Sequence, residues 1–458
     1  MTTATASPAR DRSITFLDII IGVELFLLIV MVARTYTFLP FLTFTILSWT
    51  TLLLSLAFLP FALTRLPYAG FALIAMFAII FGYQYWFASV WHTRFTGALI
   101  GSYQPLFLTP MAAILSVRFP ASRFLRIFFI AAIVHLFIYI FLYQTLDANM
   151  IRHLATSGQE ALQGQLRRTH DAAASGSYSD FKIATSDSAM AFVVLYSISH
   201  LYGQRSLWAR AGMAALAALS VYGLIVSDSR WNTAATVAGL LMLAIPMGSR
   251  VRAWLGFAIA AAGIAMVIIA ASLPFNPFSL MASDSSGIAR ALQFDTANPV
   301  FWQTPILGIG LPNQANDLDS VFTDTVYVAD LGYFGDMLGT GFVGILLILL
   351  AFWYMARFTG DLSAGEANQR AARFLSAFLI YLAIEQIFSP QLTVGLGGVF
   401  LSLSLAYIGR RSAVVPRQDD PRRRDQEDRQ RPAHGDARAR IAGQHDAENA
   451  NAGHSPRS

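Results

Sequence analysis

The sequence predicts an all-α protein, a polytopic bundle of about twelve transmembrane helices. Two observations support this prediction: hydrophobic residues make up 55% of the 458 residues, and charged residues make up only 13%. Soluble domains contain about 25% charged residues and lack repeated apolar runs of 18 or more. A transmembrane barrel would show short segments of alternating polarity instead. The chain contains no cysteine, which excludes disulfides, thiol nucleophiles and cysteine-ligated metals.

Hydropathy windows of about 19 residues divide the apolar part of the chain into twelve expected spans. The first follows a polar, lightly basic N-terminus and is too long for a signal-peptide core, so we expect an uncleaved span. The expected spans lie near 14–33, 38–62, 67–88, 98–117, 124–144, 187–204, 208–226, 233–248, 251–273, 331–356, 371–388 and 391–409.

Arginines are unevenly distributed between these spans, and this sets the expected orientation. With the N-terminus inside, the inner connections are rich in arginine and the short outer ones are poor, as the positive-inside rule requires. The inner arginines are Arg65, Arg118, Arg123, Arg126, Arg205, Arg210, Arg250, Arg252, Arg357, Arg370, Arg373, Arg410 and Arg411, and the outer ones are Arg34, Arg94 and Arg230. We therefore expect a bacterial inner-membrane protein whose outer face is periplasmic.

Two long connections and a polar tail complete the organisation of the chain. Residues 1–411 form the expected transmembrane domain, and its connections 145–186 and 274–330 both fall on the outer side. Loops of this length in a compact protein usually have a function. The second contains aromatic residues among Gly and Pro, so we expect it to fold back over the bundle. Residues 412–458 are charged and nearly free of large apolar residues, which predicts a disordered cytoplasmic tail.

The stretch "SDSRW" follows an expected span on the outer side and contains Asp228, Ser229 and Arg230. An interfacial arginine often only anchors a helix end or extends toward lipid headgroups. Arg230 differs because it breaks the charge bias of the short outer connections and lies among hydrogen-bonding groups. Asp228 and the serines could orient its guanidinium, leaving the remaining donors for a phosphate.

A second arginine, Arg290, lies early in the long outer connection 274–330, in "DSSGIARALQF". Apolar residues at helical spacing surround it, and the turn-rich segment "PILGIG" (305–310) follows. These features predict a short amphipathic helix that carries Arg290 across the outer mouth of the bundle. The competing interpretation is a solvated charge in a loop.

A third element, "DLGYFGDMLGTGFVG" (330–344), enters the next expected span. Asp330 stands at the edge of that span, where a carboxylate is costly unless it is paired or used. It could act as a general base or orient an arginine, and Tyr333 lies one turn further on. Glycines in membrane helices usually indicate close helix packing, and we expect this for most of the five glycines here.

The order of these motifs resembles the O-antigen ligase and polymerase superfamily, specifically Wzy-type exopolysaccharide polymerases. The order is Ser-x-Ser-Arg after a middle span, an arginine early in a long outer connection, P-x-x-G-x-G, and then D-x-x-Y followed by G-x-x-G. The resemblance covers roughly 187–409, about half of the chain. No single motif is specific, so the resemblance depends on their order and on the side of the membrane that they share.

The resemblance implies a metal-independent, inverting glycosyltransferase of the GT-C type that needs no cofactor. Its substrates are sugars linked to undecaprenyl diphosphate, at the periplasmic face. Arg230 and Arg290 match the two arginines expected to hold the diphosphate, and Tyr333 matches the aromatic of its motif. Asp330 departs from the histidine found in many members, notably ligases, which puts its acid–base role in doubt.

Elementary chemistry agrees with this implication. A lipid diphosphate is already a good leaving group, so the main requirement is fixed positive charge where negative charge develops. Arginine meets this requirement better than lysine because its fork matches phosphate oxygens. One carboxylate could take the proton of the attacking sugar hydroxyl, which suffices for a single displacement, unlike the carboxylate pairs of hydrolases.

The remaining candidates have competing structural interpretations. Lys182 belongs to a basic outer loop that could attract an acidic glycan, and Arg94 is placed to contact a sugar or a lipid headgroup. Four polar residues within spans could line a substrate path or simply bond neighbouring helices: Glu24, His135, Glu385 and Gln386. The sequence shows no metal-ligand spacing, P-loop or nucleic-acid surface.

Two alternative functions remain open. An O-antigen ligase would share the fold and the donor but transfer glycan to lipid A-core. A flippase or secondary transporter would show internal repeats with broken helices near the midplane, and we detect no such internal similarity. The expected partners are the lipid-linked donor and acceptor, the bilayer and, for a polymerase, a chain-length regulator.

Overall fold

Helices account for all the regular secondary structure in the part of the chain that the computed structural model describes. That part comprises residues 67–93, 121–145, 187–201, 203–204, 206–227, 229–273, 275–281, 285–311, 331–364 and 368–389, with a few isolated positions elsewhere. No strand occurs among these residues, so the predicted all-α class is confirmed.

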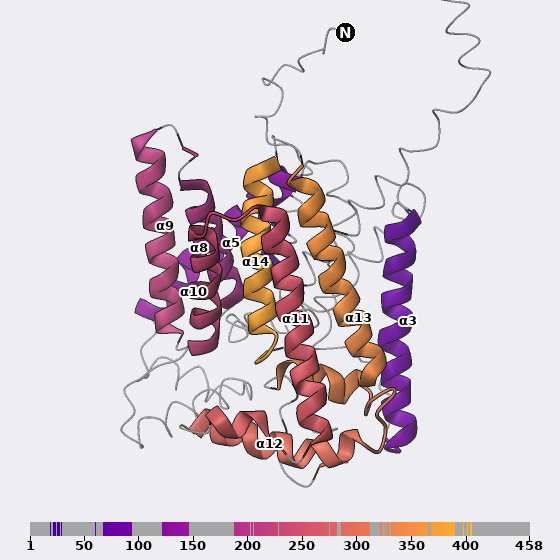
Figure 1. The fold of residues 1–458 in the computed structure, drawn as a ribbon. Coiled ribbons are helices and arrows are strands. Elements are labelled where there is room, and N and C mark those ends of the chain that lie inside the picture. The colour runs from indigo at the N-terminus through magenta and orange to yellow at the C-terminus, as the bar shows by residue number, and fades with distance from the viewer. Residues whose placement is uncertain are drawn as a thin grey trace, which may run out of the picture. The chain divides into compact units, whose positions relative to one another are not determined.

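The described helices lie within one compact unit, Met1–Gly409, and follow one another antiparallel along most of its length (Figure 1). Their bounds agree with the expected spans to within a few residues at most positions. The elements are α3 (Pro67–Val90), α5 (Ala121–Thr145), α8 (Asp187–Leu201), α9 (Leu207–Val226), α10 (Arg230–Ala244), α11 (Ser249–Ser272), the 3₁₀ helix η2 (Pro277–Met281), α12 (Ser285–Phe301), α13 (Gly332–Leu362) and α14 (Gln369–Glu385).

Four of the described helices are long and apolar enough to cross a membrane. They are Ser122–Phe141 within α5, Leu207–Val226, Ser249–Ser272 and Gly332–Leu362. The protein is therefore a polytopic helical membrane protein. The expected spans 38–62, 98–117 and 391–409 lie almost wholly outside the described residues, so the count of twelve stays a prediction.

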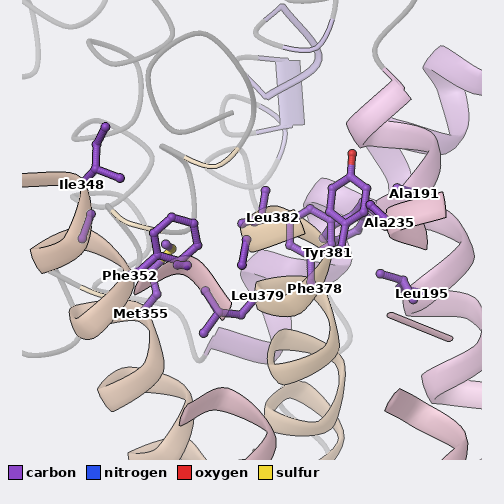
Figure 2. Close-up of a cluster of buried hydrophobic side chains, with 14 of the residues drawn as sticks. Ala191, Leu195, Ala235, Ile348, Phe352, Met355, Phe378, Leu379, Tyr381 and Leu382 are labelled. Atoms are coloured by element: carbon purple, nitrogen blue, oxygen red, sulfur yellow. The ribbon is translucent and has the colours of Figure 1, made fainter. Parts of the chain in front are cut away.

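Helix α14 is the centre of the packed bundle. It contacts α8, α10, α11 and α13, and Figure 2 shows its side chains among the apolar residues of its neighbours. Glycines allow this close approach: a Cβ at Gly256 of α11 would stand 3.1 Å from Leu379 Cγ, and one at Gly239 would stand 3.3 Å from the Ala377 carbonyl oxygen. Small residues at such contacts are the usual means of helix association in lipid.

The two ends of the bundle differ in charge. At one end α8 and α10 begin, α11 and α14 finish, and α12 carries Arg290; we call it the Arg290 end. The described arginines expected on the inner side all lie toward the opposite end: Arg123, Arg126, Arg210, Arg250, Arg252, Arg357, Arg370 and Arg373. The arginines that the sequence groups on one side therefore share one end of the bundle.

Arg252 joins two parts of this opposite end through buried hydrogen bonds. Its side chain is buried, and it donates hydrogen bonds to Ser376 Oγ (3.2 Å) and to the carbonyl oxygens of Ile245 (3.1 Å) and Met247 (3.0 Å). The two carbonyls follow α10, so one guanidinium joins the α10–α11 connection to α14. Such a buried hub should matter for folding rather than for chemistry.

We expect Arg252→Met to destabilise the protein without changing the Arg290 end. The substitution keeps an extended apolar stem but removes the donor of the Met247 carbonyl, at about 1–3 kcal/mol for a group that stays buried and unbonded. The Ile245 carbonyl keeps its bond from the Met247 amide, and Ser376 still donates to the Arg373 carbonyl. Thermal unfolding in detergent should show a clear fall in Tm. Arg250→Met, at the exposed arginine two residues earlier, is the matched control and should leave Tm nearly unchanged. Equal Tm values for the two variants would contradict the role given to Arg252.

Helix α13 is broken inside the bundle. Gly341 has φ 66° and ψ −164°, which interrupts the helix between two regular halves. The segment 305–310 packs into the break and satisfies the backbone groups that it frees. Ile309 and Gly310 donate to the carbonyls of Leu338 and Gly339 (both 2.8 Å), while the amides of residues 342 and 343 donate to the carbonyls of residues 305 and 306 (2.9 and 3.2 Å).

This arrangement explains the P-x-x-G-x-G motif. Gly308 and Gly310 have positive φ (68° and 93°), a backbone conformation that only glycine adopts without strain. A Cβ at Gly308 would also collide with the backbone of residues 338–341. The long connection thus folds back onto the bundle, as predicted.

Helix α3 bonds to the same region through three aromatic side chains. Tyr83 donates its hydroxyl hydrogen to the Thr340 carbonyl (2.8 Å), and Trp86 and Trp91 donate their indole N–H to the carbonyls of Gly308 (2.9 Å) and Ile309 (3.1 Å). The Thr340 carbonyl directly precedes the break at Gly341, the other two carbonyls belong to the segment 305–310, and Trp91 directly follows α3. The break and the segment 305–310 are therefore held from two sides, which gives α12 a fixed attachment.

Candidate active site at the Arg290 end

The predicted amphipathic helix around Arg290 is present as α12, which lies crosswise near the ends of α11 and α13 (Figure 1). Asn276 donates to the Ala291 carbonyl (2.8 Å), and Trp302 and Asn298 donate to the Ala271 carbonyl (2.8 and 3.3 Å). The ring of Phe294 packs on Phe334 of α13 at 4.4 Å. The middle and the C-terminal end of α12 are thus fastened, and Arg290, one residue before Ala291, is half-buried.

Asn232, in the first turn of α10, is the centre of a polar cluster. It accepts a hydrogen bond from the Tyr381 hydroxyl of α14, and its amide donates to Ser229 Oγ (2.8 Å) and toward Asp187 Oδ2 of α8 (3.5 Å). Asn232 and Tyr381 are both buried. Because the partners come from α8, α10 and α14, the cluster fixes three helix ends relative to one another.

Glu385, the last residue of α14, lies one helical turn after Tyr381. Its side chain is only 2% exposed. The end of α14 that bonds to Asn232 therefore also carries a buried acid.

A second buried acid, Asp336, bonds to the residue that directly follows Glu385 in the chain. Asp336, in the first half of α13, is buried, and its Oδ2 accepts a hydrogen bond from Gln386 Nε2 at 2.6 Å. This bond joins the broken helix α13 to the C-terminal end of α14, directly beside Glu385. Tyr381 of α14 and Gln386, which directly follows α14, thus join this end of the helix to α10 and to α13.

Arg230 lies at the same end of the bundle, as the first residue of α10, and its side chain is exposed. The adjacent Trp231 stacks on Phe388 with ring centroids 3.8 Å apart. Ser229 is fixed by its bond from Asn232, and the buried Ser227 donates to the Leu224 carbonyl (2.9 Å). The turn that carries Arg230 is therefore anchored through its neighbours, which leaves the exposed arginine at the surface of the site.

Tyr333 has a packing environment. Its side chain is completely buried, its hydroxyl donates to the Ala383 carbonyl of α14 (3.2 Å), and its ring fills the space beside Gly263 of α11. This is a contact between helices, and it positions the start of α13. Four further predicted site residues, Asp330, Asp228, Lys182 and Arg94, lie outside the described residues.

Sequence reasoning missed three members of the cluster: Asp187, Asn232 and Tyr381. It named Glu385 and Gln386 only as polar residues within a span that could line a path or bond helices. The available signal was weak, because each residue alone is a common polar group in a membrane helix. Their coincidence at one end of the bundle appears only when α8, α10 and α14 are assembled.

The comparison with known families agrees with the motif order. Residues 214–349 match the family model described as O-antigen ligase. This segment runs from α9 into the second half of α13 and includes Arg230, Arg290, the segment 305–310 and the helix break. No curated protein matches the chain. The family match confirms the resemblance of this chain to the O-antigen ligase and polymerase superfamily.

Proposed function

We propose that the protein is a polysaccharide polymerase that joins undecaprenyl-diphosphate-linked repeat units into exopolysaccharide or O-antigen. It acts as a metal-independent, inverting glycosyltransferase at the periplasmic face of the bacterial inner membrane. The observation that carries the proposal is Arg290, held half-buried on a crosswise helix, inside the family-matched segment and at the end of the bundle that contains the buried polar cluster. A growing glycan moves from its lipid diphosphate to the terminal sugar of the next lipid-linked repeat.

Each site residue has a role in this proposal. Arg290 and Arg230 bind the diphosphate and neutralise the charge that develops on it as the anomeric bond breaks, which needs no metal because both charges are permanent. Asp330 acts as the base or orients the acceptor hydroxyl. Ser229 and Asp228 steady Arg230. Lys182 and Arg94 complete the proposed binding residues, and Tyr333, which the sequence also suggested, contributes by positioning the start of α13 from its buried place.

A ligase is the second candidate function, and the description of the matching family as O-antigen ligase favours it. It would use the same diphosphate clamp but a lipid A-core acceptor. Asp330, which stands where many ligases have a histidine, favours polymerase over ligase. The choice therefore depends on the acceptor, which an experiment in cells can identify.

Deletion of the gene should separate the two functions by the glycan that remains. Without a polymerase, we expect lipid A-core or the cell surface to carry single repeat units and no long chains. Loss of a ligase instead leaves long chains on undecaprenyl diphosphate, and loss of a flippase leaves single lipid-linked repeats on the cytoplasmic side. Gel electrophoresis of surface glycan, together with mass spectrometry of extracted lipid-linked glycan, distinguishes these outcomes. Normal chain lengths in the deletion strain would contradict all three functions.

A further inference from the structure

Helix α12 has an exposed side that is mainly apolar, in addition to the side that packs on the bundle. Ile288 and Leu292 lie one turn apart on this exposed side and are 48% and 63% exposed. Exposed apolar residues at the same spacing continue beyond the helix with Trp302 and Ile306. We call these four residues the α12 strip. An exposed apolar surface of this kind indicates a contact that covers it.

One end of the α12 strip is continuous with the exposed side of α11. The last exposed apolar residues of α11 at helical spacing are Met266, Ile269 and Leu273. Because α11 is long and apolar enough to cross a membrane, its exposed side meets lipid. Phe275 and Leu280, which follow α11, are also exposed, and Leu280 belongs to η2, which packs on α12. The exposed apolar surface therefore passes from a spanning helix onto the crosswise one.

The other end of the α12 strip meets the exposed side of α13. The amide of Val343 donates to the Ile306 carbonyl (3.2 Å), so these two exposed residues are adjacent. Leu346 and Leu350 follow at one-turn intervals along α13, and both are exposed. Helix α13 is also long and apolar enough to cross a membrane. The strip on the crosswise helix thus connects the lipid-facing sides of two spanning helices (Figure 1).

We propose that the α12 strip lies in the bilayer leaflet at the Arg290 end, so that α12 is an interfacial helix held at the depth of the lipid headgroups. Described residues 275–281 and 285–311 contain one arginine and one aspartate, so the contact depends on apolar area and requires no anionic lipid. Asp295 is exposed on the same side of α12. A carboxylate is costly in the hydrocarbon interior, so its position fits the headgroup depth.

The environment of Trp302 agrees with this depth. Its indole N–H donates to the Ala271 carbonyl at the end of α11, while part of its ring is exposed. Tryptophan with one polar and one apolar contact is typical of the membrane–water interface. A soluble protein that covered α12 would stop at the membrane surface, whereas the α12 strip continues onto the spanning helices. The continuity therefore favours lipid as the covering partner.

This contact would also fix the depth of Arg290. Arg290 is two residues from both Ile288 and Leu292, and two residues correspond to about 200° around a helix. It therefore lies on the side of α12 that contains the buried Phe294 and Phe301, facing the bundle. A diphosphate on a lipid carrier lies at headgroup depth, so it could reach Arg290 without leaving the membrane surface. This last consequence rests on the proposed function, but the lipid contact itself does not.

Spin labels on single cysteines measure the depth directly, because the chain contains no cysteine of its own. Ile288→Cys and Leu292→Cys are labelled with a nitroxide in the full-length protein, in nanodiscs of phosphatidylcholine. Collisions with oxygen, which concentrates in lipid, and with a nickel chelate, which stays in water, give the depth of each label. We expect both labels about 5–10 Å below the lipid phosphates. The lipid reference is Ile269→Cys, and the water reference is Gly248→Cys, which is exposed in the α10–α11 connection.

The other possible coverings of the α12 strip give different results. Labels at 288 and 292 that meet the nickel chelate as often as the label at 248 would overturn the proposal, because water would then cover the strip. Immobilised labels that neither reagent reaches would also overturn it, because protein, such as a second copy of the chain, would then cover the strip. Ile306→Cys repeats the measurement at the other end of the strip, and all these exposed positions should keep the parental Tm. No glycan substrate is present, so a negative result would leave the proposed function standing.

Discussion

Arg290→Ala should lower the rate of glycan transfer by about 100-fold or more, the scale expected when one preorganised donor is removed from developing negative charge. The diphosphate leaves with its charge unshared unless a cation faces it, and α12 holds Arg290 half-buried where water competes poorly. Elongation of extracted lipid-linked repeats by the protein in nanodiscs measures the effect. Undecaprenyl diphosphate should also raise the Tm of the variant less than it raises the parental Tm.

Two further arginine variants show whether the loss of transfer rate is specific to position 290 and to the guanidinium group. Arg290→Lys keeps the charge but loses the planar fork that matches phosphate oxygens, so an intermediate rate is expected. Arg250→Ala removes an exposed arginine from the opposite end of the bundle and should leave the rate unchanged. Parental activity of both Arg290→Lys and Arg290→Ala would contradict the proposal that residue 290 contacts the diphosphate.

The architecture was largely predictable because hydrophobic length is a local signal. Helices α8, α9, α10, α11, α13 and α14 coincide with apolar runs that a sliding window finds, since each membrane helix satisfies its backbone within its own segment. The arginine bias correctly grouped the helix ends that share one side of the bundle. The amphipathic helix around Arg290 was also predictable, from apolar spacing within an otherwise polar connection.

The buried cluster was not predictable because its bonds join distant parts of the chain. Asn232 and Tyr381 are 149 residues apart, and nothing in the periodicity of α10 or α14 indicates which of their faces meet. Glu385 was visible as a polar residue in a span, but its burial at the end of α14 that bonds to Asn232 requires the helices to be packed. Long-range pairing between polar residues is information that a single sequence does not contain.

The break in α13 shows a different limit. The sequence around Gly341 is continuously apolar and predicts an unbroken span, with its glycines serving close packing. Close packing was expected for most of the five glycines, and Gly341 is an exception, because its positive φ interrupts the helix. The motif P-x-x-G-x-G predicted turns in the segment 305–310. Only the folded chain shows that this segment packs against the break at Gly341.

Gly341→Ala should therefore be among the most damaging single substitutions outside the cluster. The combination of positive φ and ψ near 180° belongs almost only to glycine, and a Cβ there would collide with the Ile306 carbonyl. We expect a loss of about 1–3 kcal/mol from backbone strain alone, with the collision in addition. Thermal unfolding in detergent should show the loss as a lower Tm.

The same substitution should lower glycan transfer by displacing α12 rather than by touching substrate. Residues 305 and 306 bond to the helix half that begins at Gly341, and they follow α12 closely, so a shift of this contact moves Arg290. Gly212→Ala is the matched control: it lies inside α9, its added methyl meets nothing within 4 Å, and alanine favours a helix by about 1 kcal/mol. That variant should be as stable and active as the parent or slightly more stable. Gly341→Ala with parental Tm and rate would show that the break is not what holds α12, and that its attachments to α11 alone fix the position of Arg290.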